Sequence, residues 1–259
     1  MFVLERARAK AGEAGAPLPN PFKRLAREGI QFRRSAVSLV AAGPGVGKSA
    51  FALAFAIGSG AKTLYFSADS DAAIQYERAA AMLTGRTVHE IAAMVESGDT
   101  RYVDSKLASL RKLRWCFESS PSIDDIQNHV WCWAYVYGEW PELIIVDNVG
   151  DVSPDTEEGG HIALESVMDY LVDLGRKTGA HVMGLHHLTG EYDDGASPPP
   201  LSALKGKISK KPSLSLNLFR QGEGRLGVVV GKNRTGKPDA AGQYRLALNV
   251  DLARMQVTD

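Results

Sequence analysis

The sequence has no excess of charge of either sign, because 30 lysines and arginines balance 30 aspartates and glutamates. A zero net charge removes any argument from bulk charge for binding to nucleic acid or membranes, although a local basic patch can still bind either. Cysteine is scarce too, with only Cys116 and Cys132. Both lie in apolar or aromatic segments, so we expect buried free thiols rather than a disulfide framework.

Long apolar runs are also missing. No run of about 18 apolar residues is present, so we expect no membrane span and no membrane partner. The first ten residues lack the apolar core of a signal peptide, and we therefore expect a cytoplasmic protein. What is present is ordinary for a globular chain: 44% of the residues are apolar and 23% are charged, in a length that allows one large domain or two small ones.

An alternation of apolar strands with helical patterns begins after Ser35. We expect strands over residues 36–42, 62–67, 113–118, 142–147 and 180–186, and helices over residues 47–58, 71–84, 87–97, 101–112, 122–138 and 160–178. This alternation predicts an α/β fold with a mainly parallel sheet flanked by helices on both faces. Three shorter strands separated by Gly-rich turns, at 213–219, 225–231 and 243–250, predict an antiparallel extension at the C-terminal end.

An N-terminal arm is expected over residues 1–21, followed by one domain over residues 22–259. Residues 2–11 can be helical, whereas glycines and prolines break regular structure over 12–21 and predict a linker. Two fates remain open for the arm: it is disordered, or it docks on a neighbouring subunit.

A phosphate-binding P-loop follows the first expected strand. The apolar run 38–42 leads into a Gly-rich turn that ends in Gly47, Lys48 and Ser49, and a helical segment follows at once. This order is typical of a P-loop, although Ala42 stands where the motif has glycine. Lys48 is expected to reach the β- and γ-phosphates of ATP, and the Ser49 hydroxyl to bind Mg²⁺. The predicted nucleotide-binding residues are Gly43, Pro44, Gly45, Val46, Gly47, Lys48, Ser49 and Ala50.

Two acidic residues end neighbouring strands, where ligands gather in α/β sheets. Asp147 follows the apolar run 143–146 and is expected to hold the metal, the alternative being an aspartate that caps a loop. Asp69 ends the strand after the P-loop helix and is a candidate general base for the attacking water. At least one of the next two residues, Ser70 and Asp71, is expected to cap the following helix instead.

Adjacent histidines, His186 and His187, end the strand at 180–186. Neighbouring side chains on a strand point to opposite faces, so the pair cannot chelate one metal ion. We expect one of them, His187, to face the γ-phosphate as a polar sensor. The alternative is a hydrogen-bonded core histidine.

Basic residues gather in two segments of the C-terminal half. Lys232 and Arg234 lie in an expected hairpin turn, which is either solvated within one subunit or reaches the γ-phosphate of a neighbour. The long segment 189–212 ends in lysines that either contact nucleic-acid phosphates or are solvated. These candidate DNA-binding residues are Lys205, Lys207, Lys210 and Lys211.

An aromatic cluster comprises Trp131, Trp133, Tyr135, Tyr137 and Trp140. All but Trp140 fall within the expected helix 122–138, for which Ser122 is the expected N-cap. The cluster is compatible with base stacking, but packing is the expected role because large aromatic side chains mostly fill cores and interfaces.

With these residues the chain resembles the RecA-like hexameric helicases, namely the ATPase domain of DnaB-type replicative helicases and the plasmid RepA type, over about residues 36–250. Residues 45–49 resemble their P-loop, 145–147 their Mg²⁺ strand, 201–205 the segment that leads out of their DNA-binding loop, and 232–236 their trans-acting Lys-x-Arg finger. Asp69 lies where they carry the catalytic glutamate and is one methylene shorter. The pair at 186–187 is closer to the RepA pattern than to the DnaB sensor glutamine.

The resemblance implies a RecA-like ATPase domain that uses ATP and Mg²⁺ to translocate on single-stranded DNA in DNA replication. It further implies a homo-oligomer, a hexameric ring with nucleotide sites between subunits, in a bacterium or encoded by a phage and acting in the host cytoplasm. The catalytic residues are then Lys48, Asp69, Asp147, His187, Lys232 and Arg234. Two alternatives stay open: a RecA-type recombinase or circadian-type ATPase, and a non-hydrolysing nucleotide-gated DNA-binding or loader subunit.

Overall fold

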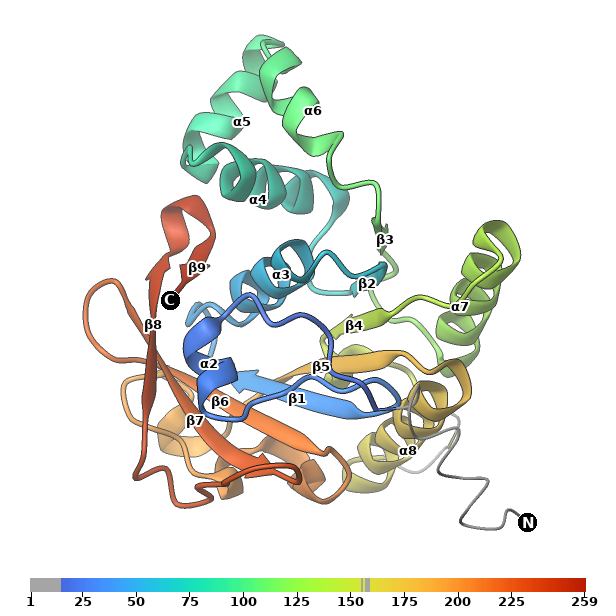
Figure 1. The fold of residues 1–259 in the computed structure, drawn as a ribbon, viewed down its shortest axis with the longest axis vertical. Helices are drawn as coiled ribbons and strands as arrows, with labels where there is room; N and C mark the ends of the chain where they lie inside the picture. The colour runs from blue at the N-terminus through green and yellow to red at the C-terminus, as the bar shows by residue number, and fades with distance from the viewer. Residues whose placement is uncertain (1–14, 155, 157–158) are drawn as a thin grey trace.

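The computed structural model describes residues 15–154, 156 and 159–259, and a single sheet forms its centre (Figure 1). The strands lie in the order β3–β2–β4–β5–β1–β6–β7–β8–β9. They are β1 (Val37–Ala42), β2 (Thr63–Ser67), β3 (Leu113–Cys116), β4 (Leu143–Asp147), β5 (His181–His187), β6 (Leu214–Arg220), β7 (Arg225–Asn233), β8 (Leu246–Asp251) and β9 (Gln256–Thr258). Pairing is parallel from β3 to β6 and antiparallel from β6 to β9. The predicted fold class is therefore confirmed.

Helices cover both faces of the sheet. Alternate residues of β1 point into two separate cores, with Val40 on the side of α2 (Lys23–Arg27) and α3 (Lys48–Ser59), and Leu39 on the side of α7 (Ile123–Tyr137) and α8 (His161–Thr178). Because both faces are covered, every residue of β1 and β4 is buried, as their continuous apolar sequences predict.

Three further helices, α4 (Ala72–Thr84), α5 (Val88–Ser97) and α6 (Arg101–Leu107), stack beyond α3 at the top of Figure 1. They enclose a small core of their own around Ile91 and Val103. Asp71 is the N-cap of α4, since its side chain accepts a hydrogen bond from the amide of Ile74, as expected for one of the two residues after Asp69. Ser122 caps α7 in the same manner and forms a capping box with Asp125.

The boundaries differ from the predicted ones where elements are short. The helix expected to reach residue 112 ends at Leu107, and β7 runs two residues beyond the expected end, to Asn233. Helix α2 and strand β9 were not predicted, because five- and three-residue elements show too little periodicity and owe their stability to tertiary packing. Segment 189–212 is not one irregular loop, since it contains the 3₁₀ turns η2 (Gly190–Tyr192), η3 (Leu201–Ala203) and η4 (Lys205–Lys210).

The described part of the predicted linker contacts the domain. Residues 1–14, most of the predicted arm, lie outside the described residues. Within the predicted linker, however, the amide of Leu18 donates to the carbonyl of Phe32, and the amide of Arg34 donates to the carbonyl of Ala16. The Leu18 side chain is buried in the core beside Phe22. Part of the predicted linker is therefore bound to the domain by hydrogen bonds and apolar packing.

The two cysteines are free, as expected, but only Cys116 is buried. Burial raises the pKa of its thiol to about 12. Cys132 is exposed on α7, which corrects the expectation of two buried thiols. Among the described helices, none combines the length and the apolar character that crossing a bilayer requires.

His181, at the start of β5, gives the fold a defined response to acid. It is buried, its Nδ1 donates to the carbonyl of Arg33, and its Nε2 accepts from the hydroxyl of Ser38, each over 2.8 Å. Burial lowers its pKa to about 4, despite the opposing effect of the Arg33 hydrogen bond. The folded chain therefore holds the neutral imidazole at pH values where the unfolded chain is already protonated.

Stability should consequently fall as the pH falls below the unfolded value of about 6.5. Between pH 7 and pH 5 we expect His181 to account for a loss of about 2 kcal/mol in the free energy of unfolding, measured by urea denaturation at both pH values. Between the same pH values, the free energy of unfolding of a His181→Asn variant should fall by about 2 kcal/mol less than that of the wild type. His89→Gln, at an exposed histidine, should behave as the wild type. Equal losses for His181→Asn and the wild type would refute this prediction.

Candidate nucleotide-binding site

The P-loop turn follows β1 and leads directly into α3, as predicted. Gly47 has a φ of 117°, which a residue with a side chain rarely adopts, and it places Lys48 at the first turn of α3. Gly43 is required for a different reason, because a Cβ atom there would lie 1.9 Å from the carbonyl oxygen of Asp193. The turn is therefore fixed both by its own backbone and by the segment after η2 that packs against it.

A cavity of about 440 Å³ opens above this turn. Its wall contains every predicted nucleotide-binding residue except Val46, whose buried side chain faces the Gly195 backbone instead. Asp69 and His187 also line the cavity, so residues that follow β1 and β2 meet the last residue of β5 at one place, as expected for the carboxyl ends of parallel strands. Its full lining is Gly43, Pro44, Gly45, Gly47, Lys48, Ser49, Ala50, Asp69, Arg78, His187, Leu252 and Met255.

Asp147 lies beneath this cavity at the end of β4 and is only 2% exposed. Burial raises the pKa of its carboxyl group, and the nearby ammonium group of Lys48 acts in the opposite direction. One carboxylate oxygen, Oδ2, accepts a hydrogen bond from the hydroxyl of Tyr65 at 2.8 Å. The other, Oδ1, is buried and has no hydrogen-bond partner among the described residues.

This donor set fits a divalent cation. A buried carboxylate oxygen without a partner is costly unless a ligand completes it, and Mg²⁺ prefers oxygen ligands. The Ser49 hydroxyl is close enough to lower the pKa of Asp147. Ser49 and Asp147, the two predicted metal residues, are therefore adjacent, and together they can hold Mg²⁺ with nucleotide phosphates.

His187 is half-buried in the cavity wall, and Asn148 fixes its orientation. Asn148 Nδ2 lies 2.7 Å from His187 Nε2 and donates to it when that nitrogen is unprotonated. Burial, and then the charge of Lys48, lower the pKa of His187, so the neutral ring is favoured. Its Nδ1–H is then the hydrogen-bond donor, a suitable group for a phosphate oxygen.

His186 points to the other face of β5, as the strand geometry predicts. It is buried and its Nε2 donates to the carbonyl of Lys205 over 2.8 Å, at the start of η4. Burial lowers its pKa to about 4. Strand β5 therefore contacts the nucleotide cavity through His187 on one face and the basic segment through His186 on the other.

Lys232 and Arg234 lie at the opposite end of the sheet from their own P-loop. Lys232 pairs with Ser215 at the end where β1 and β6 begin, while the P-loop follows the other end of β1. Lys232 Nζ donates to the carbonyls of Ser209 and Lys210 at 2.7 Å each, and Arg234 donates to that of Lys210 at 3.2 Å. The expectation of a simple hairpin turn is thus corrected: Lys232 belongs to β7, and both side chains bind the end of η4.

The four candidate DNA-binding lysines are not equivalent. Lys205 and Lys210 are exposed on η4, whereas Lys211 forms an ion pair with Asp169 on α8. The side chain of Lys207 lies outside the described part of the structure. Lys205 and Lys210 are therefore the described members with free charge at the surface.

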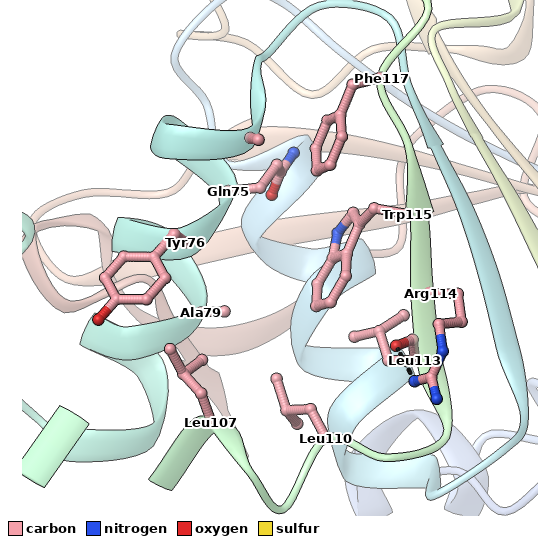
Figure 2. Close-up of a pocket in the computed structure, with 10 residues that line it drawn as sticks. Gln75, Tyr76, Ala79, Leu107, Leu110, Leu113, Arg114, Trp115 and Phe117 are labelled. Carbon is pink, nitrogen blue, oxygen red and sulfur yellow. Dashed lines mark hydrogen bonds between the residues drawn. The ribbon is translucent and has the colours of Figure 1, made fainter. Parts of the chain in front are cut away.

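A larger, mostly apolar cavity of about 490 Å³ lies between α4 and the edge strand β3 (Figure 2). Leucines and alanines form much of its wall, and Trp115 and Phe117 project into it from β3 and the residues after it. Gln75 joins it to the nucleotide site, because its Nε2 donates to the hydroxyl of Ser67, the residue paired with Asp147. The sequence offered no pattern from which this cavity could be predicted.

The aromatic helix is only partly a packing element. Trp133 is buried and lies 4.7 Å from the ring of Tyr137, as expected. Trp131 is 58% and Tyr135 is 91% exposed, so the expectation that the whole cluster packs is corrected. The reason is that the cluster is wider than the single face that α7 turns toward the sheet.

Five residues of the site escaped the sequence analysis: Tyr65, Arg78, Asn148, Leu252 and Met255. Arg78 could have been found, because it lies two helical turns after the N-cap Asp71, and it donates to the Ser70 hydroxyl at 2.9 Å. Leu252 and Met255 follow β8 and reach the P-loop only through the order of the strands. No local pattern could indicate that contact.

Comparison with known proteins adds a family and two relatives. Residues 5–191 match the family described as an AAA domain. A protein called Gene 65 protein from Mycobacterium phage L5 is 41% identical over 265 residues, which cover all of this chain and 99% of that protein. The Gene 65 protein of Mycobacterium phage D29 is 40% identical, over 85% of this chain and 98% of its own length.

Two solved structures share the fold. A DnaB-like replicative helicase, described with its interactions with primase, superposes with a TM-score of 0.83 at 15% identity and covers all of this chain and 67% of its own. A second structure, an ATPase domain, gives a TM-score of 0.82 at 16% identity over 99% of this chain and 95% of its own. The predicted RecA-like helicase ATPase fold is therefore confirmed.

Proposed function

Because this chain belongs to the AAA domain family, we propose that it is an ATPase that moves along single-stranded DNA as a homo-oligomeric ring, in the manner of a replicative DNA helicase. The observation that carries this proposal is the split arrangement of its charged residues. Lys48, Asp69 and His187 surround one cavity, while Lys232 and Arg234 lie at the far end of the same sheet. A site that needs both groups must form between two subunits.

Within one subunit, each residue has a separate role toward the nucleotide. Backbone N–H groups of residues 45–49 bind phosphate oxygens, and Lys48 binds the β- and γ-phosphates. Ser49 and Asp147 hold Mg²⁺, which neutralises charge on those phosphates. Asp69 orients or deprotonates the attacking water, and His187 donates to the γ-phosphate.

The neighbouring subunit completes the site. We assign Lys232 and Arg234 to a trans-acting pair that stabilises charge on the γ-phosphate during transfer. In the isolated chain, both side chains are held by carbonyls of Ser209 and Lys210. Contact with a neighbour's phosphate exchanges these neutral acceptors for a charged one, which is the stronger hydrogen-bond partner for a cation.

The same geometry supports a route from the nucleotide to the DNA. Segment η4 carries Lys205 and Lys210, starts at the carbonyl held by His186 and ends at the carbonyls held by Lys232. Strand β5 carries His187 of the nucleotide cavity, and β7 carries Lys232 of the proposed trans-acting pair. Both strands therefore contact the candidate DNA-binding segment directly. Non-specific contact with phosphates is the binding mode that such a basic segment provides. In a phage, as the relatives suggest, this activity serves DNA replication in the host cytoplasm.

The proposal is tested by measuring phosphate release from ATP and Mg²⁺ with and without single-stranded DNA, together with the native mass. We expect a multimer of the full chain and a rate that single-stranded DNA increases several-fold. A monomer whose rate of phosphate release is the same with and without single-stranded DNA would exclude the proposed motor. Electron microscopy with an ATP analogue and DNA separates a closed ring from the filament of a recombinase.

One observation favours the second candidate, a non-hydrolysing nucleotide-gated subunit. Asp69 lines the cavity but is one methylene shorter than glutamate. A background rate in the wild type, with turnover gained in Asp69→Glu, would favour this candidate. The motor predicts turnover in the wild type and its loss in Asp69→Asn, because an amide cannot accept the proton of water.

A further inference from the structure

We propose that Tyr65 is a positioning residue for the metal site: its hydroxyl group holds the carboxylate of Asp147 in one orientation and thereby presents the second carboxylate oxygen to Mg²⁺. The inference deepens the proposed function and rests on it, since it requires a nucleotide site that uses a divalent cation. Tyr65 Oη donates to Asp147 Oδ2 over 2.8 Å, and both side chains are buried. Asp147 Oδ1 has no hydrogen-bond partner among the described residues.

The register of the two strands explains why Tyr65 makes this contact. Ser67 on β2 lies opposite Asp147 on β4, and Tyr65 is two residues earlier on the same face. Diagonal neighbours across a strand pair lie within reach of a long aromatic side chain. The Ser67 hydroxyl is occupied, since it donates to the carbonyl of Ser70 and accepts from Gln75.

A carboxylate needs such a partner to act as a defined ligand. The last torsion of an aspartate side chain is broad, so a buried carboxylate with one free oxygen can turn. The hydroxyl of Tyr65 binds one oxygen and limits this rotation, so that Oδ1 would be available as a ligand when a cation is bound. Hydrogen-bond partners of metal ligands act in this way generally, and their loss typically lowers metal affinity about 10- to 100-fold.

The rival explanation is that Tyr65 only fills the core. Its ring packs in the apolar cluster around α3, and phenylalanine would fill the same space. Tyr65→Phe therefore removes the hydroxyl alone and separates the two explanations. A purely structural role predicts no change in the dependence on Mg²⁺.

The experiment titrates Mg²⁺ against the full chain with a fluorescent ATP analogue and measures the half-saturating concentration. We expect Tyr65→Phe to raise that concentration about 10- to 100-fold. Binding of the analogue in EDTA should change little, because it does not depend on the metal. The thermal unfolding midpoint should fall, because the variant leaves Asp147 Oδ2 buried without its hydrogen-bond partner. Direct titration of Mn²⁺, followed by electron paramagnetic resonance, gives a second readout that does not involve turnover.

Tyr76→Phe is the matched control. The Tyr76 hydroxyl also donates to an aspartate, Asp104, over 2.8 Å, but it lies on α4 beside the apolar cavity and not at the metal residues (Figure 2). The control should keep the wild-type dependence on Mg²⁺. If Tyr65→Phe keeps it as well while the wild type responds to Mg²⁺, this inference is wrong and the proposed function stands. If the wild type binds the analogue equally well with and without Mg²⁺, both the inference and the proposed function are wrong.

Discussion

Replacing Arg234 with alanine is expected to lower ATP hydrolysis about 10³- to 10⁵-fold, the range found for arginine fingers, while nucleotide affinity changes little. The reason is positional. Arg234 follows β7 at the end of the sheet where β1 begins, whereas the P-loop follows the other end of β1. We therefore expect its guanidinium group to contribute little to nucleotide binding in its own subunit and, under the proposed function, to act on a neighbour's γ-phosphate during transfer.

A mixing experiment tests the assignment to the neighbour. Arg234→Ala subunits retain an intact P-loop, and Lys48→Ala subunits retain an intact Arg234, so interfaces that join the two intact halves should be active. With random assembly of equal amounts, about a quarter of the head-to-tail interfaces have both halves, and the rate should recover toward that fraction. Each variant alone should stay near background. No recovery on mixing would place the role of Arg234 within its own chain.

The control must account for the contact that Arg234 already makes. It donates to the carbonyl of Lys210, so its loss could disturb η4 without any role in catalysis. The thermal unfolding midpoint of Arg234→Ala reports such a disturbance. Arg245→Ala, which removes an exposed arginine from the same connection between β7 and β8, should leave both the midpoint and the rate unchanged.

Replacing Lys48 with alanine is expected to abolish hydrolysis, with a fall of at least about 10²- to 10³-fold, and to weaken nucleotide binding as well. Lys48 is only 7% exposed and lies in the wall of the nucleotide cavity beside Asp147. An ammonium group in a partly dehydrated site interacts more strongly with phosphate charge than it does in water. Both the bound nucleotide and the transition state therefore lose stabilisation.

Measurement of affinity separates this variant from Arg234→Ala. Titration of a fluorescent ATP analogue should show weakened binding for Lys48→Ala and near wild-type binding for Arg234→Ala. Lys237→Ala, at an exposed lysine in the connection after β7, is the control for the loss of one positive charge. Full turnover in Lys48→Ala would exclude the P-loop as the hydrolytic site.

The candidate site residues were predictable where a local pattern indicated them. The P-loop and Asp69 follow apolar strands, and Asp147 ends another. Because parallel strands bring their carboxyl ends together, the order of elements predicted that the P-loop and Asp69 meet in one cavity and that Asp147 lies close to Lys48 and Ser49. Tyr65 was not predictable, because a tyrosine inside an apolar strand reads as core. Only the register of β2 against β4 brings its hydroxyl to Asp147.

The sequence by itself determined the fold class, the P-loop and the candidate acids, because alternation of apolar residues and glycine-rich turns are local properties of the chain. The tertiary structure alone decided which end of the sheet carries Lys232 and Arg234, and that the turn after β8 closes one side of the cavity with Leu252 and Met255. Strand order and register are set by contacts between residues far apart in the chain. These contacts turn one predicted P-loop into half of a site that a second subunit is proposed to complete.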